Sequence, residues 1–271
     1  MTTLLPHIAH VAIDRLWPDH GSISWQLHPA INILSGVNGM GKSTIINAIV
    51  RGLELGIDEA HQQGIHLTLM PQGSTSIPFD VIRSFDRPAL SGDVLRKLAG
   101  TTAATELDMQ LFLLQRRYLD YQVNLGNRMI ELLTCGSETS RAEATEVAQV
   151  KLRFQDLVDD LFSETGKQVD RTLNEMVFLQ KGEHLRPYQL SSGEKQMLVI
   201  LLTVLTQDQR PCVLLMDEPE VSLHIEWQQR LVDLIRQLNP NAQIILTTHS
   251  PALIMDGWLD AVTDVADILT D

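Results

Sequence analysis

The chain has 271 residues, 44% of them hydrophobic and 20% charged, so it can bury a full core and is not disordered or fibrous over most of its length. The balance of 21 Lys and Arg against 34 Asp and Glu gives a formal net charge of −13, which does not support binding to nucleic acid or to an anionic membrane. No segment reaches the roughly 18 apolar residues of a membrane span, the N-terminus lacks a secretory signal and the two cysteines are isolated, so we expect a cytoplasmic protein.

The N-terminal third alternates short strands with one helix. Strands are predicted at 8–13, 22–27 and 31–34, with turn residues that favour a hairpin between the first two. Residues 43–55 have helical periodicity, and two further strands are predicted at 66–70 and 79–84.

A helical insertion is predicted from about residue 94 to 165. Its apolar residues recur at helical spacing, Gly136-Ser137 interrupts them, and a second helix is predicted at 141–162. We interpret this segment as a lobe packed on the core.

The last third returns to an alternation of strands and helices. Strands are predicted at 175–179, 212–216 and 242–247, and helices at 194–205 and 227–238. This alternation predicts an α/β fold with a mainly parallel sheet, an N-terminal antiparallel subsheet and the helical lobe. The expected domains are 1–92 and 167–271, the two parts of the core, and 93–166, the insertion.

A glycine-rich loop between a predicted strand and a predicted helix carries the strongest motif. Residues 36–43 match G-x-x-x-x-G-K-[ST], in which backbone N–H groups surround phosphates, Lys42 reaches the β- and γ-phosphates and the Ser43 hydroxyl binds Mg²⁺. The predicted nucleotide-binding residues are Gly36, Val37, Asn38, Gly39, Met40, Gly41, Lys42, Ser43 and Thr44.

Two acids follow the buried strand at 212–216. Asp217 is expected at the carboxyl edge of the sheet, where it can hold Mg²⁺ through water. Glu218 is then positioned to accept a proton from an attacking water.

A second anion-binding device precedes the apolar helix at 194–205. Ser191, Gly193 and the helix N-terminus can receive a phosphate. One nucleotide does not need two such devices, so the second is expected to serve a nucleotide bound to a neighbouring chain. The alternative is an ordinary N-cap, by Ser191 or Ser192, of a core helix.

Four motifs occur in the order found in ABC-type ATPases: the phosphate loop, Leu190-Ser191-Ser192-Gly193-Glu194, the Asp217-Glu218 pair and Thr247-Thr248-His249-Ser250. The chain most resembles the non-transporter branch of P-loop ATPases, the RecF/SMC-like and OLD-like proteins. The resemblance implies ATP and Mg²⁺ as ligands. It also implies a signature motif at 190–196, Ser222 in a loop across a dimer interface and His249 as a switch residue at the γ-phosphate. The residues implied to contact the partner's nucleotide are Ser191, Ser192, Gly193, Glu194 and Ser222.

The chain departs from the family pattern in three ways. Ser192 and Glu194 stand where transporters usually have Gly and Gln, and Glu-Pro-Glu…Leu-His replaces a Thr-Ser-Ala-Leu-Asp continuation. The OLD-like enzymes carry a C-terminal nuclease domain, for which no room follows His249, so any nuclease is expected to be a separate protein.

Two site residues and one acidic stripe are less specific. Gln72 is expected to sense Mg²⁺ and the attacking water, with Gln115 or Gln122 as alternatives, and Trp17 to stack on adenine unless it is a core residue of the hairpin. Asp256, Asp260, Asp264, Asp267 and Asp271 fall at helical spacing and suggest either a surface for a basic partner or a solvated or unstructured tail.

These observations predict an ATPase that closes head-to-tail around two ATP molecules into a homodimer or higher oligomer. Glu218 would act as general base, and Lys42 with Mg²⁺ would stabilise charge on the phosphates. The resemblance implies that the resulting switch acts on a separate effector protein in DNA maintenance or phage defence. The alternatives are the motor subunit of a membrane transporter and a nucleotide-gated scaffold with slow turnover.

Overall fold

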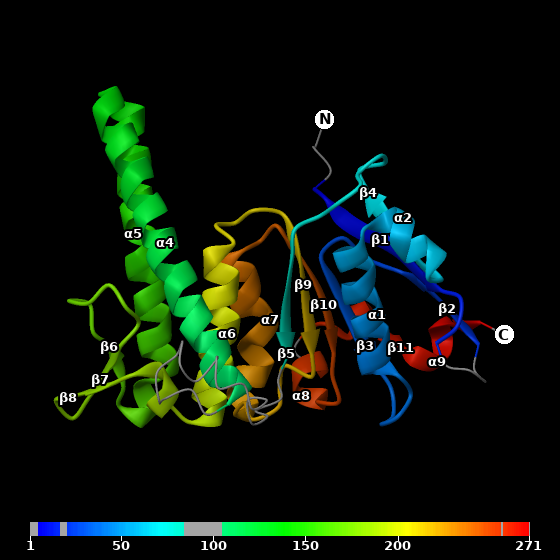
Figure 1. Ribbon diagram of the computed structural model, residues 1–271. Coiled ribbons are helices and arrows are strands. Elements are labelled where there is room, and N and C mark those ends of the chain that lie inside the picture. Colours follow the sequence, from blue (N-terminus) through cyan, green and yellow to red (C-terminus); the bar gives the residue numbers. More distant parts are fainter. Residues whose placement is uncertain (1–4, 17–20, 84–104, 256, 271) are drawn as a thin grey trace, which may run out of the picture. The chain divides into compact units, whose positions relative to one another are not determined.

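A computed structural model describes residues 5–16, 21–83, 105–255 and 257–270 (Figure 1). The chain divides into two compact units, one formed by 1–84 with 209–271 and the other by 85–208. The expected domain boundary at 92–93 and the start of the helical insertion fall outside the described residues.

The first unit is built on a parallel five-stranded sheet in the order β11–β3–β10–β9–β5. The strands are β11 (Val262–Asp264), β3 (Ile31–Ser35), β10 (Ala242–Thr247), β9 (Cys212–Asp217) and β5 (Phe79–Arg83). Every residue of β9 and β10 is buried, as expected for central parallel strands covered on both faces. The α/β class with a parallel sheet is confirmed.

An antiparallel sheet in the order β12–β2–β1–β4 completes this unit. Its strands are β12 (Leu269–Thr270), β2 (Ser22–Gln26), β1 (His7–Ile13) and β4 (Ile65–Met70), and the predicted β1–β2 hairpin is present. Helix α1 (Lys42–Leu55) packs its apolar face into a core shared by both sheets. Helices α2 (Ile57–Gln62), α7 (Ile225–Leu238) and α8 (Pro251–Met255) complete the unit, and α2 is absent from the sequence prediction.

The acidic C-terminal stripe does not form one helix. The segment is divided among the 3₁₀-turn η4 (Leu259–Ala261), β11, α9 (Val265–Ile268) and β12. Backbone pairing of β11 with β3 and of β12 with β2 overrides the spacing of the acids, and Asp264 caps α9 by accepting from Ala266 N–H at 2.9 Å. Asp256 and Asp271 lie outside the described residues.

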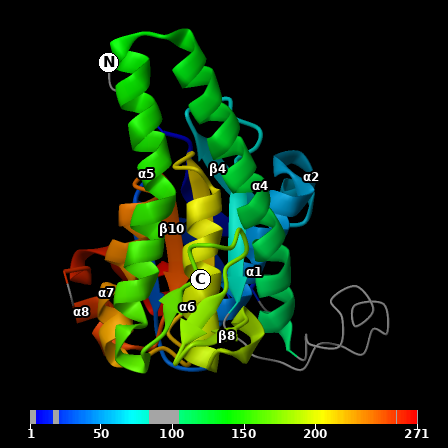
Figure 2. The ribbon, with the colours of Figure 1, turned by 90° about the vertical axis from the view of Figure 1, so that its left-hand side faces the viewer.

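The second unit contains the helical hairpin of α4 (Glu106–Cys135) and α5 (Glu138–Leu161), which lie side by side and are joined at one end (Figure 2). Thr105 and Asp108 form a capping box at the start of α4, Gly136 ends it in the left-handed conformation, and Ser137 caps α5. The predicted break at Gly136-Ser137 is therefore confirmed. None of the helices in the described ranges is long and apolar enough to cross a membrane.

The rest of this unit is a small antiparallel sheet and one buried helix. The sheet comprises β6 (Gln168–Val169), β7 (Phe178–Gln180) and β8 (Glu183–Leu185), the turns are η2 (Ser163–Thr165) and η3 (Pro187–Gln189), and the helix is α6 (Ser192–Thr206). Strand β7 begins later than predicted because the Gln115 side-chain amide binds both polar backbone groups of Met176, which are then not available for strand pairing. It donates to the Met176 carbonyl at 2.8 Å and accepts from its N–H at 2.9 Å.

Candidate functional site

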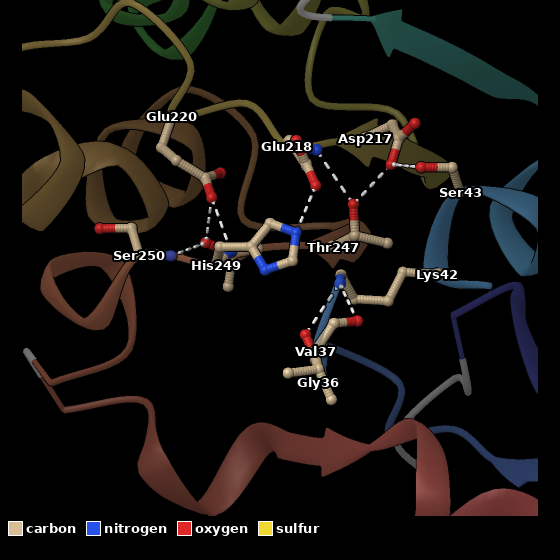
Figure 3. A network of polar contacts seen from close by, with 11 residues as sticks. Gly36, Val37, Lys42, Ser43, Asp217, Glu218, Glu220, Thr247, His249 and Ser250 are labelled. Carbon is tan, nitrogen blue, oxygen red and sulfur yellow. Dashed lines mark hydrogen bonds and ion pairs between the residues drawn. The ribbon is translucent and has the colours of Figure 1, made fainter. Parts of the chain in front are cut away.

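The phosphate loop lies between the end of β3 at Ser35 and the start of α1 at Lys42. Gly39 and Gly41 have φ values of 86° and 90°, a region that L side chains rarely adopt, which explains the glycines at these positions. Lys42 folds back over the loop and donates to the carbonyls of Gly36 and Val37 at 2.8 and 3.2 Å (Figure 3). Among the described residues no side chain caps α1, so N–H groups of its first turn are left to bind an anion.

Strand pairing brings a hydroxyl and a carboxylate together beside this loop. Asp217, the last residue of β9, lies opposite Thr247 of β10 and accepts from its hydroxyl at 2.7 Å. The same oxygen of Asp217 accepts from the Ser43 hydroxyl at 3.0 Å. Mg²⁺ prefers oxygen ligands such as hydroxyls and carboxylates. The Ser43 hydroxyl and the Asp217 carboxylate therefore fit this ion.

Glu218 contacts His249 from a strained backbone position. Its φ of 49° is unusual for a residue other than glycine, and its N–H is held by the carbonyl and hydroxyl of Thr247 at 3.2 and 3.0 Å. Its carboxylate lies 2.6 Å from His249 Nε2 (Figure 3). Because an ionised carboxylate only accepts, Nε2 carries the proton in this contact.

The loop after Glu218 is bonded to the loop that carries His249. Glu220, 8% exposed, accepts from the Thr248 hydroxyl at 2.5 Å and from the His249 N–H at 2.8 Å. Gln228 donates to the Leu223 carbonyl at 2.9 Å and accepts from the Ser250 hydroxyl. The sequence analysis assigned no role to Glu220, Thr248 or Gln228. The first two lie within the Glu-Pro-Glu and Thr-Thr-His-Ser motifs, which were the available signal. Ser222, in the same loop, has a φ of 70°.

The signature motif lies in the second unit, at the start of α6. Ser191 is the N-cap, and Glu194 completes a capping box by accepting from the N–H and hydroxyl of Ser191 at 3.0 and 2.9 Å. Glu194 also accepts from Lys167 at 2.8 Å and from Thr165 at 2.9 Å. Its carboxylate is therefore used inside the unit, while Ser191 and Ser192 are exposed.

Burial by itself would raise the pKa of Glu194. The hydrogen bonds from Lys167, Ser191 and Thr165 outweigh this effect and hold the pKa below its ordinary value. Glu194 is thus a charged capping residue, which explains an acid where transporters usually have Gln.

The contacts of Gln72, Gln115 and Gln122 within the described residues give no support to a sensor role for any of them. Gln72 is exposed in the turn between β4 and β5, and β5 runs parallel to β9 with Phe79 opposite Val213 and Arg83 opposite Asp217. This turn therefore leads to the end of β5 that is remote from Asp217, and the sensor role of Gln72 has no support. The Gln122 amide donates to the Asn174 carbonyl at 2.7 Å, as that of Gln115 does to Met176. Trp17 lies outside the described residues.

A protein-family comparison decides the classification. The family model described as "AAA domain, putative AbiEii toxin, Type IV TA system" matches residues 118–256, just over half of the chain. The chain belongs to this AAA-domain family. The matched part includes the signature motif, the Asp217-Glu218 pair and His249.

Relatives of this AAA-domain protein agree with that assignment. It is 24% identical to the Septu protein PtuA of Bacillus thuringiensis, over 86% of this chain and 69% of that protein. It is 25% identical to the Retron Vc95 probable ATPase of Vibrio cholerae, over 60% of this chain, and spans about a third (34%) of that protein's length.

Solved structures confirm the fold. The Smc head domain of Pyrococcus furiosus, with an extended coiled coil and bound to the C-terminal domain of ScpA, matches with a TM-score of 0.51 at 13% identity. The match covers 93% of this chain and 92% of that one. The AAA-domain protein therefore has the fold of the Smc head domain.

Proposed function

We propose that this AAA-domain protein binds ATP with Mg²⁺ and hydrolyses it at the phosphate loop. The observation that carries the proposal is the chain of contacts that joins Ser43, Asp217, Thr247, Glu218 and His249, next to Lys42 of the phosphate loop (Figure 3). A cation, two magnesium ligands and an acid–imidazole pair at a glycine-rich loop suit phosphoryl transfer to water.

Each residue has a role that follows from its chemistry. Lys42 and the first-turn N–H groups of α1 hold the phosphates, while Ser43 and Asp217 hold Mg²⁺, which neutralises developing negative charge when it is bound. Glu218 accepts the proton of the attacking water. His249 Nε2 contacts Glu218 in this structure, and with ATP bound it would donate instead to an oxygen of the γ-phosphate, next to that water.

We further propose that two copies close head-to-tail around two ATP molecules. Ser191, Ser192 and Gly193 are the members of the signature motif that suit contact with a nucleotide of another copy, because both serines are exposed whereas Glu194 is buried and paired with Lys167. Ser222 would lie at the same interface, in a loop bonded to the loop of His249 through Glu220 and Gln228. ATP would then favour the closed dimer because each nucleotide contacts both copies.

The output of this cycle is proposed to be a conformational switch on a separate effector protein in the cytoplasm. The retron and Septu relatives, and a family description that names a toxin–antitoxin system, support a role in phage defence. DNA maintenance is the second setting that the family resemblance suggests.

Phosphate release and ATP binding test the catalytic proposal, with wild type, Lys42→Ala and Glu218→Gln measured together. We expect Lys42→Ala to lose ATP affinity, and Glu218→Gln to keep affinity but lose turnover by about a hundredfold or more. Turnover by Glu218→Gln at the wild-type rate would contradict the role of Glu218. Tight ATP binding without turnover in wild type would favour the nucleotide-gated scaffold.

A further inference from the structure

We propose that Glu220 is a positioning residue that holds His249 in its catalytic orientation. The inference rests on the proposed function, and it concerns a residue in the short loop that follows β9. Figure 3 shows the Glu220 carboxylate directed at the loop that carries His249 and Ser250. It accepts from the Thr248 hydroxyl and the His249 N–H through a single oxygen, Oε1.

The burial of Glu220 requires an explanation. A buried carboxylate is costly unless cations or hydrogen-bond donors compensate for the loss of water. Among the described residues no Lys, Arg or His side chain forms an ion pair with Glu220, and its other oxygen, Oε2, is buried without a hydrogen-bond partner. The hydrogen bonds of this carboxylate therefore come from the His249 loop, which indicates that Glu220 fixes the conformation of this loop.

The side chain and the backbone of His249 both contact the loop that follows β9. Glu218 contacts the imidazole at 2.6 Å, and Glu220 accepts from the backbone N–H of the same residue at 2.8 Å. Pro219, between the two acids, fixes one backbone dihedral and limits their relative movement. Glu220 therefore fixes the backbone of His249 at the position in which the imidazole meets Glu218, the proposed general base.

The Thr248 hydroxyl extends this arrangement. It donates to Glu220 and accepts from the Ser250 N–H at 2.9 Å, so one acid fixes the loop through three consecutive residues. Removal of the Glu220 carboxylate leaves buried donors unsatisfied and releases the loop. Release that moves the imidazole by about 1 Å is enough to slow a reaction by on the order of a hundredfold.

A double-mutant cycle separates this role from general structural support. We expect Glu220→Ala to lower kcat for ATP by about tenfold to a hundredfold with KM changed by less than about threefold. In a His249→Ala background, the same substitution should cost less than about twofold, because its effect passes through His249. Glu220→Gln, whose carbonyl can accept both hydrogen bonds, should restore most of the lost rate. An equal loss of kcat in both backgrounds would overturn the proposal.

A second variant protects the test against misfolding of Glu220→Ala. Thr248→Val removes one of the two donors to Glu220 and leaves the carboxylate in place. We expect it to lower kcat severalfold in the wild-type background and to have no further effect in His249→Ala. A loss of the same size in both backgrounds would contradict the proposed route through His249.

Nitrogen NMR of the histidine rings reports the orientation without hydrolysis. The His249 signals are assigned among the 9 histidines by their loss in His249→Gln. We expect Glu220→Ala to shift the Nε2 signal in the same direction as Glu218→Gln, since both weaken the contact with Glu218, and Glu220→Gln to leave it near wild type. An unchanged signal in Glu220→Ala overturns the positioning role. Because this readout needs no turnover, it holds even if the wild type fails to hydrolyse ATP.

Discussion

Glu194 belongs to the predicted signature motif and also stabilises the start of α6. At the start of α6 it accepts hydrogen bonds from Ser191, Lys167 and Thr165, and its side chain is 3% exposed. The sequence identified the cap and the signature as alternatives, and the structure shows that the cap is present. Contacts of Glu194 with Thr165 and Lys167 were not predictable, because they join residues almost thirty positions apart.

The lowered pKa of Glu194 makes stability depend on pH. A carboxyl whose folded-state pKa lies below its ordinary value of 4.5 stabilises the fold fully above that value, and this contribution is lost as the pH falls through the folded-state pKa. We expect the free energy of unfolding to fall as the pH drops below about 5, and to fall less in Glu194→Gln. Urea unfolding at several pH values measures the pH dependence of the unfolding free energy in wild type and in Glu194→Gln. An equal pH dependence in the two proteins would contradict the role of Glu194.

Glu220 and Gln72 mark the limits of prediction for single residues. The sequence motif contained Glu220, but its role depends on the distance between the loops after β9 and β10, which the sequence does not give. Gln72 was predicted from its place near a strand end. The strand before it, β4, lies in the antiparallel sheet, whereas the strand whose end adjoins Asp217 is β5.

Two glycines in helices provide a matched test of packing at the scale of elements. A methyl group at Gly52 of α1 would lie 2.9 Å from Ile65 Cγ2 and 3.0 Å from Leu67 Cδ1 on β4, whereas one at Gly126 of α4 meets no atom within 4 Å. Gly52→Ala should therefore destabilise the fold by about 1–3 kcal/mol. Gly126→Ala should stabilise it by about 0.5–1 kcal/mol, through helix propensity alone. Chemical denaturation checks both signs, and stabilisation by Gly52→Ala would contradict the close packing of α1 on β4.

The base of the helical hairpin depends on a buried ion pair. Lys195 of α6 contacts Asp108 of α4 at 2.8 Å, with the side chains 11% and 4% exposed. Lys195→Met leaves a buried carboxylate without its cation and should cost about 3–5 kcal/mol. The control is Arg153→Met, which breaks an exposed pair with Glu146 on α5 and should cost less than about 1 kcal/mol. Equal costs in urea unfolding would contradict the role assigned to burial.

Element prediction succeeded where periodicity and burial agree. The apolar runs of β9 and β10 and the capped helix α6 appear almost as predicted, because central strands and buried helices leave few alternatives. It failed where long-range contacts decide the local structure. Gln115 shortens β7, and pairing with β3 turns part of the acidic tail into β11.

At the scale of the whole molecule, the proposed mechanism requires a second copy. Each chain carries one phosphate loop and one signature motif, and in the proposed dimer the signature motif of one copy contacts the nucleotide of the other. ATP should then act as the link between copies, and hydrolysis should release it.

The mass of the AAA-domain protein in solution tests this claim most directly. Light scattering after size exclusion should show Glu218→Gln shifting from 30.4 kDa to twice that mass, or a higher multiple, only when Mg-ATP is present. Lys42→Ala should not shift, and adding Ser192→Arg, an exposed signature substitution, to Glu218→Gln should abolish the shift without loss of ATP binding. A mass that stays constant while ATP is bound would contradict the ATP-dependent dimer.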